Sequence, residues 1–120
     1  MTMTRRRRGQ IGESAAAAFL AEQGMQIIKR NYRCPLGEID IIARDGRELV
    51  FVEVRTRSSS TFGTPKETVD QRKQMRLRRL AAYYLSRPGL DKQPCRFDVV
   101  AVCLDRREKV AKLEHIRGAF

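Results

Sequence analysis

Residues that build zinc sites and cysteine–histidine catalytic centres are scarce in this chain. Its 120 residues include three cysteines, Cys34, Cys95 and Cys103, and one histidine, His115. The cysteines are odd in number and show no Cys-x-x-Cys spacing, which argues against a disulfide framework and against a structural zinc site. We therefore expect reduced cysteines and a cytoplasmic location. His115 has no evident nucleophile near it in the sequence, so we assign it no catalytic role.

Long apolar runs are also missing, so the sequence predicts no membrane-spanning helix and no membrane partner. The N-terminal sequence, MTMTRRRRGQIGESAAAAFLAEQG, places an apolar stretch after a basic start, as a signal peptide does. Gly12, Glu13 and Ser14 interrupt it, and residues 15–21 are at the short limit for an apolar region, so we expect no signal peptide. Residues 1–8 are expected to be a flexible basic tail, and residues 9–120 to form one domain.

Acidic residues are outnumbered in this sequence. There are 14 Asp and Glu residues against 25 Lys and Arg residues, which gives a net charge of +11. In a domain of this size, such an excess favours a polyanionic partner, most simply nucleic acid. We expect DNA rather than RNA. The sequence leaves open whether the chain works alone or as a homodimer.

Apolar periodicity and turn residues predict two helices and five strands. The predicted elements, in order, are a helix at 9–23, a strand at 25–33, two strands within 37–57, a helix at 71–86, and strands at 95–104 and 109–115. Residues 58–63 are expected to be a polar loop, and Thr64, Pro65 and Glu67 predict a short helical turn at 65–68. Helix, three strands, helix, strand, strand is the order of a single α/β domain.

The central hairpin carries acids on its strands. Its two alternating runs are joined by an Asp-Gly pair, which is a strong hairpin signal. A two-residue loop makes Glu53 a diagonal neighbour of Asp40, and a four-residue loop puts the two side chains directly opposite, about 5 Å apart. Like charges at that distance destabilise a sheet, so we expect Asp40 and Glu53 to bind a divalent metal, Mg²⁺ or Mn²⁺, with Arg55 beside it. The alternative is a solvated hairpin face with Arg–Glu pairs.

Three further residues each allow a structural and a functional interpretation. Glu13 is either an acid near the positive end of its helix or a third metal-binding carboxylate. Glu38 shares the face of Asp40, and we favour a pairing with basic side chains over a supporting role in the site. Lys73 begins the apolar stripe of its helix and either extends to the surface or faces phosphate. The basic side chains expected to contact nucleic acid are Arg55, Arg57, Arg72, Lys73, Arg76 and Arg79.

Several motifs together resemble a known family. They are GEIDIIARDGRELVFVEVRTR, FGTPKETV, Lys73, AAYYL and CRFDVVAV. The chain thereby resembles the YraN family of restriction-endonuclease-like proteins, which is similar to Holliday-junction resolvases within the PD-(D/E)XK nuclease superfamily. The resemblance implies an α/β fold with a central mixed sheet flanked by helices and a site at one sheet edge. It implies that Asp40 and Glu53 bind metal, that Glu13 is the acid of the first helix, and that the second helix brings Lys73 toward the site.

Arg55 stands where the superfamily has a lysine. Arginine stays protonated in proteins, so Arg55 cannot act as a general base, but it can orient water and stabilise charge. The first function hypothesis is therefore a metal-dependent nuclease that hydrolyses DNA phosphodiester bonds, with branched or structured DNA as a candidate substrate. The second is a nucleic-acid-binding module that keeps the nuclease fold and performs no chemistry. A third is a protein-interaction domain.

Overall fold

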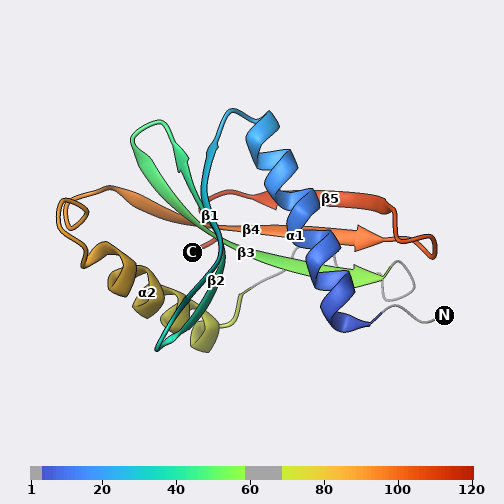
Figure 1. Cartoon of the computed structure of the whole chain (residues 1–120), viewed down its shortest axis with the longest axis horizontal. Helices are drawn as coiled ribbons and strands as arrows, with labels where there is room; N and C mark the ends of the chain where they lie inside the picture. Colours follow the sequence, from blue (N-terminus) through green and yellow to red (C-terminus); the bar gives the residue numbers. More distant parts are fainter. Residues whose placement is uncertain (1–3, 59–68) are drawn as a thin grey trace.

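A computed structural model of the chain describes residues 4–58 and 69–120 (Figure 1). Within these ranges the elements are α1 (Arg5–Glu22), β1 (Gln26–Cys34), β2 (Gly37–Asp45), β3 (Glu48–Ser58), α2 (Gln71–Leu85), β4 (Cys95–Leu104) and β5 (Val110–Ile116). The predicted single α/β domain and its element order are confirmed. Ser58, which was expected to begin a loop, is the last residue of β3; the rest of that expected loop, residues 59–63, and the expected helical turn at 65–68 lie outside the described residues. None of the described helices is both long and apolar enough to cross a membrane.

The five strands form one mixed sheet in the order β1-β2-β3-β4-β5. β3 and β4 pair in parallel, and every other neighbouring pair is antiparallel. The parallel pair follows from the crossover between β3 and β4, which contains α2. Figure 1 shows α1 and α2 on opposite sides of the sheet, so the mixed sheet flanked by helices is present as expected.

The hairpin of β2 and β3 has the register expected for the longer loop, although its turn contains only residues 46 and 47. Asp45 pairs with Glu48, and the ladder continues as far as Ile41 opposite Val52. Beyond that pair, the Asp40 side chain takes over, because its Oδ2 accepts the Val54 N–H at 2.8 Å. In Figure 1, β2 swings away from the direction of β3 here. Asp40 therefore lies at the fork where the two strands separate.

α1 packs closely on the sheet because small residues occupy its inner face. Ala16 and Leu20 are fully buried in one of the two cores, and Gly12 lies directly against β3. A Cβ added at Gly12 would lie 1.8 Å from Thr56 Oγ1, so only glycine allows this approach. The helix begins at Arg5, with the Thr4 hydroxyl accepting the Arg7 N–H at 3.1 Å. Residues 5–8 are therefore helical, which corrects the predicted tail and moves the helix start forward from residue 9.

α2 covers the opposite face of the sheet. Asp70 caps it, since its Oδ1 accepts the Lys73 N–H at 2.9 Å. Leu80 and Tyr84 are buried in the second core, where Tyr84 meets Phe51 edge-on at a centroid distance of 5.9 Å. The predicted buried stripe and the start of this helix are confirmed.

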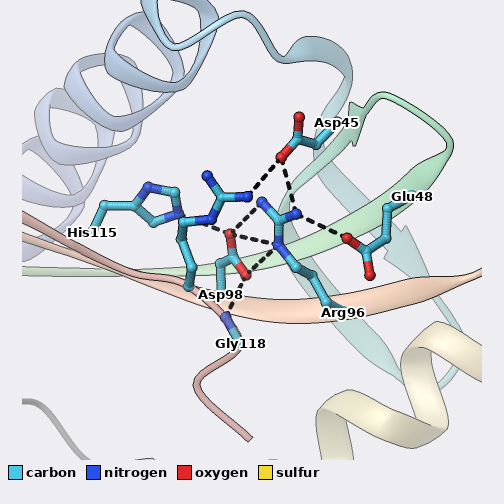
Figure 2. A network of polar contacts seen from close by, with 7 residues as sticks. Asp45, Glu48, Arg96, Asp98, His115 and Gly118 are labelled. Carbon is cyan, nitrogen blue, oxygen red and sulfur yellow. Dashed lines mark hydrogen bonds and ion pairs between the residues drawn. The ribbon is translucent and has the colours of Figure 1, made fainter.

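A buried polar network fixes the C-terminal segment to the sheet (Figure 2). Its centre is the Asp98 carboxylate on β4, which is bound by His115 Nε2 at 2.8 Å, Arg96 Nε at 3.0 Å and the Gly118 N–H at 3.0 Å. Burial alone would raise the pKa of Asp98, but these partners outweigh it and lower that pKa. The His115 ring also packs edge-on against Phe19 of α1 at 6.0 Å. These contacts give His115 a structural role.

Candidate metal centre

Three carboxylates from two elements converge at the fork between β2 and β3. Glu13 of α1 meets Glu38 and Asp40 of β2, and one carboxylate oxygen from each lies within 4.8 Å of the others. Glu38 and Asp40 are two residues apart on one strand, so their side chains share a face. The Gly12 contact with Thr56 brings α1 close to β3 next to Glu13. The expected meeting of Glu13 with Asp40 is therefore present.

Asp40 has the most perturbed ionisation of the cluster. Its pKa is raised from an ordinary 3.8 to about 7, chiefly by burial and further by the negative charges of Glu13, Glu53 and Glu38. The hydrogen bond from Val54 opposes this shift. Because one Asp40 oxygen is held by β3, the carboxylate has a fixed orientation at the fork.

Glu13 is perturbed in the same direction. Burial raises its pKa, and the charge of Glu38 raises it further, against smaller opposing contributions from Arg30 and a hydrogen bond with Asn31. Asn31 has a left-handed backbone conformation, with φ of 53°, and is next to Arg30 on β1. Three elements, α1, β1 and β2, therefore contribute to the surroundings of this acid.

Glu53 and Arg55 lie beside the cluster on β3. Arg55 Nε contacts Glu53 Oε2 at 3.3 Å, and both side chains are mostly buried. Glu53 is close enough for its charge to raise the pKa of Asp40. In the described part of the chain, however, the set that fits within 4.8 Å contains Glu38 and not Glu53. Glu53, which was expected to bind the metal together with Asp40, therefore lies beside the cluster of three acids and is paired with Arg55.

Glu38 has both the neighbours expected of it and an additional pair of acids beside it. It does pair with a basic side chain, as expected, since Arg33 Nε lies 3.2 Å from Glu38 Oε2. It also belongs to the cluster of three acids. The sequence feature that places Glu38 in the cluster is its position two residues before Asp40. Both residues lie at the end of β2 where pairing with β3 has stopped.

Lys73 and the basic row of α2 are not part of this cluster. Lys73 is half-buried in the first turn of α2, and in ranges 4–58 and 69–120 its side chain forms no ion pair with the acids. Lys73 was expected to be brought toward the site, but it makes no direct contact with the acids in the described part of the chain. The other arginines predicted to contact nucleic acid on α2 and β3 are exposed: Arg57, Arg72, Arg76 and Arg79.

The fold and the acid cluster together define a single-domain α/β protein with a carboxylate site at a fork of its sheet. The sequence matches the family described as "Uncharacterised protein family UPF0102" over residues 12–102, a range that contains every acid of the site. The chain belongs to this family, which confirms the resemblance to YraN proteins.

Similar proteins occur in several bacteria. A UPF0102 protein of Moorella thermoacetica is 72% identical over 120 residues, the whole of both chains. One of Pelotomaculum thermopropionicum is 46% identical over the same full length. One of Symbiobacterium thermophilum is 58% identical over 97 residues, which are 81% of this chain and 82% of the relative. These names describe a family without a stated activity.

Proposed function

We propose that this protein is a cytoplasmic, metal-dependent nuclease that hydrolyses phosphodiester bonds in DNA. The observation that carries the proposal is the convergence of Glu13, Glu38 and Asp40 within 4.8 Å, in a domain with a net charge of +11. Carboxylates supply the metal ligands of such a site, and the positive surface attracts the polyanionic substrate. The resemblance to Holliday-junction resolvases favours branched DNA as the substrate.

The donor set fits Mg²⁺ or Mn²⁺. Glu13, Asp40 and Glu38 offer hard oxygen ligands, and Glu53 is a fourth acid beside them. The raised pKa of Asp40 supports a cation at this point, because a bound cation would replace repulsion with attraction. When bound, the metal would activate a water molecule and offset charge on the phosphate oxygens.

The neighbouring residues have distinct roles in this proposal. Val54 holds one oxygen of Asp40 and so fixes the orientation of the carboxylate. Arg55, held by Glu53, presents a permanent positive charge that orients water or the phosphate but does not take up a proton. Lys73 and the exposed arginines of α2 contact the nucleic acid away from the reacting phosphate.

A cleavage panel tests the proposal. Duplex DNA, single-stranded DNA, a four-way junction and RNA are incubated with Mg²⁺ or Mn²⁺ and the parent protein, Asp40→Ala, Glu53→Ala or Asp91→Ala. Asp91 is an exposed acid outside the cluster and serves as the matched control. We expect the Asp40 and Glu53 variants to lose about 100-fold or more in rate, and the control to retain parental rates. Cleavage that is unchanged in both site variants would refute the assignment.

The pairing of Arg55 with Glu53 favours one rival function. An arginine in the lysine position, tied to an acid at 3.3 Å, is also what a nuclease fold without catalysis would contain. The protein would then bind nucleic acid in a salt-dependent manner that survives loss of Asp40, and it would bind no Mg²⁺ at millimolar concentration. Calorimetric titration of the parent and Asp40→Ala with Mg²⁺ separates the two functions.

A further inference from the structure

A cavity of about 260 Å³ opens between the first turns of α1 and the end of β3. Its lining residues are Arg5, Arg8, Gly9, Glu13, Val54 and Thr56. Glu13 belongs both to this cavity and to the acid cluster, so the two are adjacent. We propose that the cavity binds a phosphate group of the nucleic acid, held by Arg8 and Arg5 next to the metal centre. This inference rests on the proposed function, because it names where that substrate is held.

Arg8 occupies a position where the helix pattern calls for an apolar residue. Residues 8, 12, 16 and 20 are spaced by four and form one stripe of α1. Gly12, Ala16 and Leu20 are buried against the sheet. Arg8 continues this stripe toward the N-terminus and is its one basic member. A cation placed on a sheet-facing stripe points to an anion between the helix and the sheet.

The Arg8 side chain has an unused hydrogen-bond donor. Its Nε is buried and has no hydrogen-bond partner among residues 4–58 and 69–120. Burying a donor without an acceptor is unfavourable, so native structures rarely leave one unpaired. A phosphate in the cavity would accept from the terminal nitrogens of this guanidinium, and a turn of the side chain toward the phosphate would give the Nε–H an acceptor as well.

The cavity is shaped and charged for a small anion. A Cβ added at Gly9 would meet nothing within 4 Å in the described part of the chain, so the helix backbone there leaves room beside it. The volume is below the range of about 300–1,000 Å³ typical of pockets that enclose whole small molecules, which suits a single group of a larger ligand. Two arginines against one glutamate give the lining a positive balance.

The other arginines of this helix end differ from Arg8. Arg7 Nε is paired with Glu108 Oε2 at 3.0 Å, and Arg6 is exposed and does not line the cavity. Arg6 therefore provides a matched control, since its replacement removes the same charge from the same helix turn. Arg5 is exposed and lines the cavity, so it provides a second test position that has no part in the core.

Nucleic-acid binding in EDTA tests the inference without metal or cleavage. Fluorescent duplex DNA with either a 5′-hydroxyl or a 5′-phosphate is titrated with the parent, Arg8→Met, Arg5→Met and Arg6→Met, and thermal unfolding of each is recorded. Arg8→Met keeps the aliphatic length but removes the unpaired donor. We expect it to bind about 10-fold more weakly, a loss of one charge-assisted contact, and to unfold at the parental temperature or above. Arg5→Met is expected to weaken binding in the same direction, and Arg6→Met to change it less than about 2-fold.

The two DNA ends identify the source of the phosphate. An equal loss on both duplexes assigns the cavity to an internal phosphodiester, and a loss confined to the 5′-phosphorylated duplex assigns it to a terminal phosphate. Parental binding by Arg8→Met and Arg5→Met overturns the inference, as does an equal loss in Arg6→Met or the absence of any binding by the parent. Cleavage that persists in such a case leaves the nuclease proposal standing. If DNA binding depends on Arg8 but no DNA is cleaved, the nuclease proposal is refuted and the assignment of the cavity as a phosphate-binding site stands.

Discussion

Opposing effects act on the pKa of Asp40. The hydrogen bond from the Val54 N–H stabilises the charged carboxylate, whereas burial and the charges of three neighbouring acids destabilise it. The destabilising effects prevail, so the pKa is raised. When the pKa of a carboxyl group is higher in the folded chain than in the unfolded chain, its ionisation lowers the free energy of unfolding, which is a cost to stability. This cost is absent below the ordinary value of 3.8, grows as the pH rises to about 7, and is constant above.

Replacing Asp40 by Asn is therefore expected to stabilise the metal-free protein at alkaline pH. The amide oxygen can still accept the Val54 N–H, while the repelled charge is gone. Thermal unfolding in EDTA should show a higher melting temperature for Asp40→Asn at pH 8, with a gain that shrinks toward pH 4. Asp91→Asn, at an exposed acid, should show no such trend. A gain that is the same at both pH values would contradict the assigned cause.

The sequence predicts part of this site and misses part of it for identifiable reasons. Alternation along β2 and β3 is enough to place Asp40 and Glu53 near each other, because either loop length keeps them on one face. Glu38 is close to the other acids because β2 stops pairing with β3 after Ile41. The pairing stops there because the Asp40 side chain, rather than a backbone carbonyl, accepts the Val54 N–H. Alternation alone contains no information on such a departure.

At the scale of elements, the approach of α1 to β3 determines where Glu13 lies. Gly12 permits the contact with Thr56, and its neighbour Glu13 is thereby brought to the acids of β2. The helix start illustrates the limit of local reasoning. The cap at Thr4 is a recognisable signal, but four consecutive arginines look like a solvated tail unless the sheet beside them is known.

The two glycines of α1 provide a matched pair for testing this contact. Gly12→Ala places a Cβ against Thr56 and should destabilise the protein by about 1–3 kcal/mol, measured by urea unfolding. Gly9→Ala meets open space and should stabilise it by about 0.5–1 kcal/mol, because alanine is the better helix former. Gly12→Ala should also weaken Mg²⁺ binding, since α1 moves away with Glu13. Equal stability of the two variants would show that the close approach is not required.

At the scale of the whole molecule, the net charge of +11 is spread over surfaces with different expected roles. The exposed arginines of α2 include Arg72 and Arg76. Arg47 and Lys92 are equally exposed but lie near the hairpin turn, at the other end of β2 from the acid cluster. A substrate that extends along α2 to the acid cluster is expected to contact Arg72 and Arg76 but not Arg47 and Lys92.

The salt dependence of DNA binding distinguishes the two surfaces. Each phosphate contact contributes about 0.9 to the slope of log affinity against log salt concentration. Arg72→Gln combined with Arg76→Gln should reduce that slope by about 2, whereas Arg47→Gln combined with Lys92→Gln should leave it near the parental value. Equal reductions would indicate attraction by net charge alone.

The parallel pairing of β3 with β4 has a consequence for how the protein can vary. All the acids of the site, Arg55 and the cavity between α1 and β3 lie within residues 5–58, before the crossover to β4. Residues 69–120 supply α2, β4 and β5, which support the sheet and carry much of the outer basic surface. The acid cluster and the elements that support it are thus consecutive along the chain rather than interleaved. A change confined to residues 69–120 is therefore expected to alter the outer basic surface and to leave the acid cluster in place.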